Sequence, residues 1–101
     1  MNQWSKEDFL KRLESGKSGA LYLYTPLCGT CKIAEKMVRV LHDLFPDLPM
    51  GASDVNYLPD LAESFQIESV PCLVLFKNQK VVEKIYAFHS VPFLYEKVKM
   101  L

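Results

Sequence analysis

Apolar and charged residues recur at helical intervals near the start of the chain and then give way to a short apolar run. Over residues 4–14, WSKEDFLKRLE, the large apolar side chains are spaced among charges as on one face of a helix. Ser5 is a favourable N-cap, and Asp8 three residues later resembles the acid of a capping box. The run ALYLY over residues 20–24 predicts a buried strand.

A longer helical pattern follows Pro26 and ends at Pro46. Its apolar positions predict one buried face, made of Ile33, Met37, Val40, Leu41 and Leu44. The segment LPMGASDV, residues 48–55, is expected to carry a strand whose ends its proline and glycine leave undefined. LPDLAESFQ, residues 58–66, predicts a short helix with a proline in its first turn.

The last part of the chain predicts a hairpin followed by a helix. CLVLF, residues 72–76, is a continuous apolar run typical of a central strand. The polar turn KNQK connects it to VVEKIYAF, residues 81–88, which alternates as a paired strand does. Ser90 is a suitable cap for a closing helix over residues 90–101.

The predicted order of elements is therefore α-β-α-β-α-β-β-α. Alternation in the first half indicates parallel strands joined by crossovers, and the late hairpin indicates an antiparallel edge. We expect an α/β fold with a mixed central β-sheet and helices on both faces. No linker, repeat or low-complexity tract interrupts the pattern, so residues 1–101 are expected to form a single domain.

Charge and composition narrow the classes of function. Lys plus Arg and Asp plus Glu each number 12, so the net charge of zero gives no sign of binding to nucleic acid or to an anionic membrane. No apolar run approaches the roughly 20 residues of a membrane span, and charges run through residues 1–19, unlike a secretory signal. We therefore expect a cytoplasmic protein, in which stable structural disulfides are rare.

The sequence CGTC stands where a predicted strand ends and the long helix begins. Helix N-termini carry unpaired N–H groups and partial positive charge, which stabilise a thiolate. Cys28 should face solvent, and Cys31, one turn deeper, should be more covered. This asymmetry suits a cycle in which Cys28 attacks a substrate disulfide and Cys31 resolves the mixed disulfide. Gly29 permits close approach of backbone, and Lys32 adds a nearby positive charge.

A C-x-x-C pair can also bind metal. A structural zinc site needs four ligands, and CGTC supplies two. The further candidates are Cys72, His42 and His89, which form no second paired motif, so no metal site is expected. A metal or iron–sulfur binding module that uses CGTC, and an interaction domain whose cysteines turn over slowly, remain the alternative functions.

With these motifs placed, the chain resembles the thioredoxin family over nearly its whole length. The resemblance rests on ALYLYTPLCGTCK, on FQIESVPCLVLFKNQKVV, on the late hairpin and on the closing helix. It implies that the chain has a thioredoxin fold, that it is a protein-disulfide oxidoreductase without a cofactor, and that it serves cell redox homeostasis. It also implies disulfide-containing protein substrates, with electrons supplied by a thioredoxin-reductase-type flavoprotein or by a low-molecular-weight thiol.

The resemblance assigns further roles to single residues. Pro71 would be the family's cis-proline, and the backbone of Val70 would pair with extended substrate segments. Leu27, Val70 and Phe88 would form an apolar rim around Cys28. Cys72 is either a small apolar residue of a buried strand or a redox modulator close to CGTC.

Some residues depart from the family pattern. Leu27 stands where many thioredoxins have tryptophan, and Thr30 stands where proline is commonest. Tyr22 replaces the family's buried acid six residues before the first cysteine, so it either packs or relays a proton. The N–H and hydroxyl of Thr30 can both reach the Cys28 sulfur, and we expect a redox potential different from the family's usual one.

Overall fold

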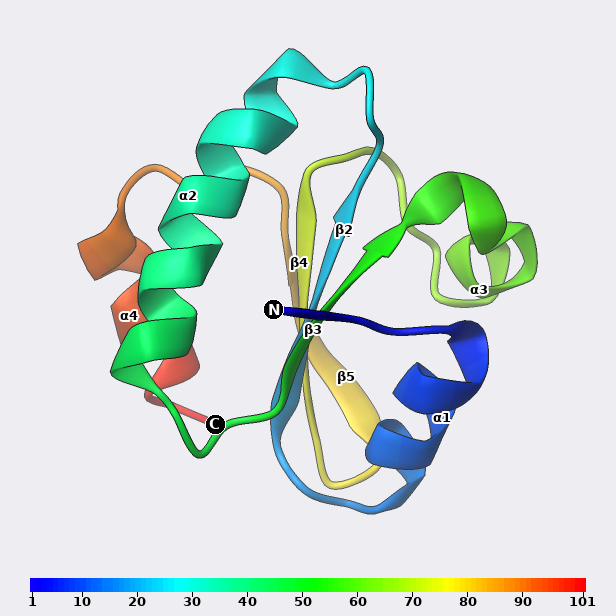
Figure 1. Cartoon of the computed structure of the whole chain (residues 1–101). Helices are drawn as coiled ribbons and strands as arrows, with labels where there is room; N and C mark the ends of the chain where they lie inside the picture. The colour runs from blue at the N-terminus through cyan, green and yellow to red at the C-terminus, as the bar shows by residue number, and fades with distance from the viewer.

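The strands form one mixed sheet in the computed structural model, which describes residues 1–101 (Figure 1). The spatial order is β1-β3-β2-β4-β5. The strands span Asn2–Gln3 (β1), Gly19–Tyr24 (β2), Met50–Asp54 (β3), Cys72–Lys77 (β4) and Lys80–Ile85 (β5). β3 pairs in parallel with β1 and β2, whereas β4 is antiparallel to both β2 and β5. The predicted α/β class and late hairpin are confirmed.

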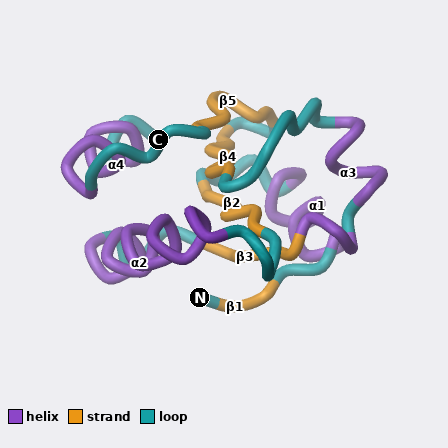
Figure 2. Tube along the Cα trace, turned by 90° about the horizontal axis from the view of Figure 1, so that it is seen from above, coloured by secondary structure: helices purple, strands orange, loops and turns teal.

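Four helices cover the two faces of this sheet. They are α1 (Lys6–Glu14), α2 (Gly29–Leu44), α3 (Pro59–Ser64) and α4 (Val91–Val98). Figures 1 and 2 show α2 and α4 on one face and α1 and α3 on the other. A single 3₁₀ turn, Val55–Tyr57, precedes α3. No helix is both long and apolar enough to cross a membrane.

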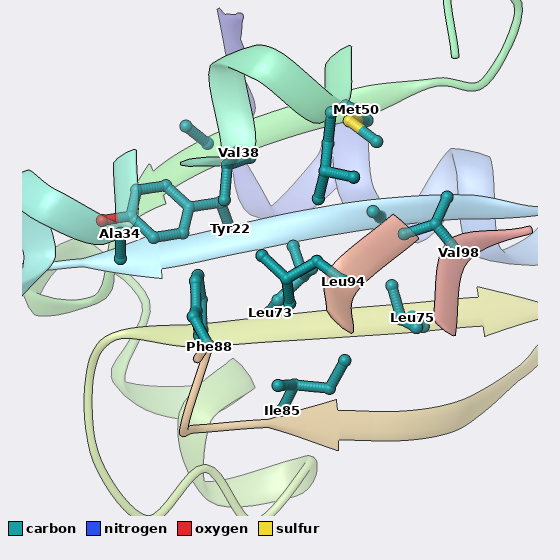
Figure 3. Packing of buried hydrophobic residues seen from close by; sticks show 13 residues of the cluster. Tyr22, Ala34, Val38, Met50, Leu73, Leu75, Ile85, Phe88, Leu94 and Val98 are labelled. Atoms are coloured by element: carbon teal, nitrogen blue, oxygen red, sulfur yellow. The ribbon is translucent and has the colours of Figure 1, made fainter. Parts of the chain in front are cut away.

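The central strands are apolar on both faces because helices cover both. Alternate residues of β2 therefore enter different cores. Tyr22 packs in the core beneath α2 and α4, which Figure 3 shows from close by, whereas Leu21 and Leu23 pack in the core beneath α1 and α3. β4 divides in the same way: Leu73 faces the α2 side, and Cys72 faces the α1 side.

The start of α1 has the capping box that the sequence predicts. The Ser5 Oγ accepts the N–H of Asp8 at 3.1 Å, and the Asp8 carboxylate accepts the N–H of Ser5 at 3.0 Å. These bonds pair two N–H groups that a helix N-terminus otherwise leaves free. They also hold the pKa of Asp8 below its usual value, with the bond from the Ser5 backbone as the largest cause.

The edge strand β1, which the sequence did not predict, brings Trp4 onto the sheet. The Trp4 indole lies over Gly51 of β3, and a Cβ atom at Gly51 would overlap the ring. The backbone N–H of Trp4 donates to the Ala52 carbonyl at 2.9 Å, and the Ser53 hydroxyl donates to the backbone carbonyl of Trp4 at 2.5 Å. The glycine in β3 is thus required by the close approach of an aromatic ring.

The predicted buried face of α2 is right at Leu41, which is buried, and in part at Met37, which packs half-buried against the core. It is wrong at Ile33, Val40 and Leu44, which are 61%, 45% and 50% exposed. The other buried residues of α2 are Cys31, Ala34 and Val38. The buried positions recur at intervals of three and four residues, so Ile33 lies on the other side of the helix and faces the surface beside CGTC.

Candidate active site

Cys28 is the N-cap of α2, at the point where the chain leaves β2. Its backbone is extended, and its Sγ accepts the N–H of Cys31 at 3.2 Å. The Thr30 hydroxyl lies 3.4 Å from the same sulfur. The sulfur therefore takes the place that a serine or aspartate oxygen usually takes at a helix start. A thiolate at this position is stabilised by the N–H group, the hydroxyl and the helix dipole.

Cys28 and Cys31 form a disulfide, with Cα atoms 5.2 Å apart. Cys28 is partly exposed, whereas Cys31 is only 3% exposed. The two sulfurs thus differ in access as their spacing predicts, because Cys31 lies on the helix face that meets the sheet. Gly29 and Lys32, which the sequence grouped with the motif, are both exposed beside it.

A groove runs beside CGTC and joins it to the segment around Pro71. The Val70–Pro71 peptide bond is cis. The groove has a volume of about 320 Å³, and its walls include Thr30, Ile33, Pro71 and Phe88. Sequence reasoning missed Ile33, since it placed this residue in the core.

The expected apolar rim is present in part. Leu27 is 99% exposed beside Cys28, and Val70 is half-buried. Phe88, expected to be exposed, is buried, with its ring 6.1 Å from that of Tyr22 in an edge-to-face contact. Phe88 still lines the groove, and the exposed large apolar side chains beside CGTC are Leu27 and Ile33.

Tyr22 holds the start of α2 onto β2. Its buried hydroxyl donates to the Cys31 carbonyl oxygen at 2.6 Å. Burial, with a smaller contribution from the Glu35 carboxylate, raises the pKa of Tyr22 to about 12. The hydroxyl therefore stays protonated near neutral pH and acts as a hydrogen-bond donor, which leaves no acid or base at this position near pH 7.

Cys72 is a free thiol, fully buried in the core beneath α1 and α3. Burial raises its pKa to about 11, with a smaller opposing contribution from a hydrogen bond with Tyr86. Tyr22 and the buried face of α2 belong to the core on the other side of the sheet. Its position corresponds to the small apolar residue that was one of its two predicted roles.

The histidines do not gather with the cysteines. No group of three or more His, Cys, Asp and Glu side chains is placed to hold a metal ion. His42 lies near the end of α2, and His89 lies at the groove with its ring 4.7 Å from that of Phe93. A metal site within one chain therefore has no ligand set here.

The chain is similar to known proteins in sequence and in fold. A family model described as Thioredoxin matches residues 1–99. The chain belongs to the thioredoxin family. It is 56% identical over 79 residues to the thioredoxin-like protein YusE of Bacillus subtilis, an alignment that covers 78% of this chain and 74% of that protein. It is 30% identical over 78 residues to thioredoxin-1 of Saccharomyces cerevisiae, covering 77% and 76% of the two chains.

Solved structures support the fold independently. Oxidised mitochondrial thioredoxin 3 of Saccharomyces cerevisiae superposes with a TM-score of 0.88 over 100% of this chain and 95% of that one, at 22% identity. Members of the thioredoxin family are disulfide oxidoreductases. With its Cys28–Cys31 pair, this thioredoxin-family chain is a thiol–disulfide oxidoreductase. The family generally reduces disulfide-containing proteins and is itself reduced by thioredoxin reductase.

Proposed function

We propose that this chain reduces disulfide bonds in proteins, with Cys28 as the attacking thiolate and Cys31 as the resolving thiol. The observation that carries the proposal is the position of the Cys28 sulfur. It is accessible, it caps α2, and it has two donors within 3.4 Å. Cys31 is buried directly behind it, so a substrate sulfur meets Cys28 first.

The proposed reaction has two displacements. The Cys28 thiolate attacks one sulfur of the substrate disulfide, forms a mixed disulfide and releases the other substrate sulfur as a thiolate. Cys31 then loses its proton and attacks the Cys28 Sγ, which forms the Cys28–Cys31 disulfide and releases the second substrate sulfur. In total, two electrons pass from the cysteine pair to the substrate, and the one proton of the Cys31 thiol goes through solvent to a released substrate thiolate.

The substrate is proposed to bind along the groove beside Pro71. The backbone of Val70 offers hydrogen bonds to an extended segment, in the way that a strand edge binds a peptide. Leu27 and Ile33 supply exposed apolar surface for substrate side chains. The groove therefore favours segments that are extended or locally unfolded.

The oxidised pair is proposed to be reduced by a thioredoxin-reductase-type flavoprotein, with a low-molecular-weight thiol as the other electron source. The free Cys72 thiol suits a compartment in which thiols stay reduced, which supports the cytoplasm as the site of action. Neither electron source requires a cofactor on this chain, because the cysteine pair carries both electrons.

Insulin reduction tests the proposal. The anaerobically purified protein, with dithiothreitol as electron source, should accelerate precipitation of the insulin B chain. Cys28→Ser should abolish this activity. Cys31→Ser should accumulate a mixed disulfide with insulin that mass spectrometry detects, and Cys72→Ala is the matched control.

Two results would overturn the assignment. Activity that persists in Cys28→Ser would show that another group attacks the substrate. A coloured protein with stoichiometric metal and no turnover would replace the oxidoreductase proposal with a metal- or cluster-binding module. The absorbance spectrum and metal content of the purified protein therefore belong to the same experiment.

A further inference from the structure

A second pocket adjoins the cysteine pair, separate from the groove at Pro71. Its volume is about 190 Å³, and both cysteines line it together with Tyr22, Tyr24, Lys32 and Glu35. A site needs only about 10–15 Å³ of such space to hold one water molecule, so this pocket has room for several. The pocket therefore places room for water against both cysteines.

Glu35 brings a carboxylate to this pocket. It lies four residues after Cys31 in α2, so the two side chains share one face of the helix with Cβ atoms roughly 5–6 Å apart. The carboxylate pairs with Arg39 at 3.3 Å on the outer side, and its side chain is 45% exposed. It is also close enough to Tyr22 to add to the rise in the pKa of that hydroxyl.

The resolving step needs a proton acceptor near Cys31, because the thiolate is the nucleophile. Tyr22 is a protonated donor to the Cys31 carbonyl, and the Tyr24 hydroxyl donates to Gln3 at 3.0 Å. Lys32 is a cation. The charged and titratable groups that face Glu35 are thus Lys32 and Arg39 from α2 and the two tyrosines from β2. Glu35 is the only residue lining the pocket that carries a carboxylate.

We propose that Glu35 accepts the proton of the Cys31 thiol, through water in this pocket, as Cys31 attacks the mixed disulfide at Cys28. The Cys31–Cys28 sulfur bond forms, the bond from Cys28 to the substrate sulfur breaks, and the electron pair leaves with the substrate. Glu35 then gives up this proton to water, and the released thiolate takes up one proton from the same water, so the carboxylate returns to its starting state. Glu35 is a proton-relay residue for this step and does not contact the substrate.

This inference rests on the proposed function, because it takes Cys31 as the resolving thiol. Stopped-flow reaction of the reduced protein with one equivalent of Ellman's reagent separates the two steps. The first release of thionitrobenzoate reports attack by Cys28, and the second reports resolution by Cys31. The measurement is made in a Cys72→Ala background from pH 5.5 to pH 9.

Glu35→Gln should leave the first phase unchanged and slow the second phase by about 10–100-fold at pH 7. This is at or below the roughly 100-fold lower limit for a general base, because water competes as proton acceptor. The deficit should shrink as pH rises, since hydroxide then ionises the Cys31 thiol. Glu35→Asp should recover part of the rate. Arg39→Gln, which removes the ion pair and keeps the carboxylate, and Glu63→Gln, on exposed α3, should retain the fast second phase.

A second phase that is unchanged in Glu35→Gln would overturn the inference. So would a second phase slowed equally at every pH, which would mark a structural effect. In both cases a normal first phase leaves the proposed function intact, whereas a first phase that persists in Cys28→Ser would overturn the proposed function itself. Unfolding of Glu35→Gln is not expected, because it removes one exposed ion pair that contributes about 0–1 kcal/mol.

Discussion

Replacing Tyr22 by Phe removes one hydroxyl from the junction between β2 and α2. That hydroxyl is buried and donates to the Cys31 carbonyl at 2.6 Å. The carbonyl keeps its partner within the helix, so the substitution leaves no unpaired buried group. The net loss is then that of one ordinary hydrogen bond, about 1 kcal/mol in the free energy of unfolding. For a domain of this size we expect Tm to fall by roughly 4–8 °C.

The pH dependence of this difference is a second part of the prediction. Folding raises the pKa of Tyr22 from 10.0 to about 12, chiefly through burial. A group whose pKa is raised in the folded state stabilises that state fully below its unfolded pKa, and the stabilisation is lost as pH rises through the folded value. The stability of the unmodified protein should therefore decline between pH 10 and 12 by a contribution that Tyr22→Phe lacks. The gap between the two proteins should narrow and then reverse over that range, because two pKa units correspond to about 2–3 kcal/mol, more than the hydrogen bond contributes.

Urea denaturation of the oxidised proteins, followed by circular dichroism from pH 7 to pH 11, measures both parts. Tyr57→Phe is the matched control, because Tyr57 is 82% exposed. Equal stability of Tyr22→Phe and the unmodified protein at pH 7 would refute the contribution of the hydrogen bond. A gap that stays constant up to pH 11 would refute the raised pKa of Tyr22.

Three further predictions concern other parts of the chain. Thr30→Val should lower the thiolate-to-thiol ratio of Cys28 about fivefold, because it removes the hydrogen bond between the Thr30 hydroxyl and the Cys28 sulfur, which contributes about 1 kcal/mol. The rate of alkylation by iodoacetamide, measured against pH, tests this, with Thr30→Ser as the control. Gly51→Ala should destabilise the fold by about 1–3 kcal/mol, because its Cβ overlaps Trp4; unchanged tryptophan fluorescence and unchanged urea midpoint would contradict this. In the native reduced protein Ellman's reagent should titrate two of the three thiols rapidly, with Cys72 reacting only after denaturation, and a third rapid thiol would contradict its burial.

The sequence predicted the order of the long elements because their patterns are local. The capping box at Ser5 and the hairpin are set by residues a few positions apart. β1 escaped prediction because two residues carry no pattern of their own, and they pair with β3 about fifty residues away. Such a strand is defined by its partner.

In the candidate site, too, residues marked by a local pattern were predicted, and residues whose role depends on contacts between elements were not. Cys28 and Cys31 were found from their spacing at a strand-to-helix junction. Glu35 was missed, since the pattern of residue types does not show that a pocket opens between this part of α2 and β2. The hydrogen bond of Tyr22 likewise depends on the distance between two elements, which residue types alone do not give.

The Cys28 sulfur is both the cap of α2 and the atom that changes oxidation state. Oxidation and folding are therefore linked through a closed thermodynamic cycle. Folding shifts the reduction potential of the cysteine pair. The same shift appears as a difference between the unfolding free energies of the disulfide and dithiol forms, about 1.4 kcal/mol for each 30 mV. Residues that alter only how well α2 is capped, without contacting any substrate, can thus set the direction in which this chain passes electrons.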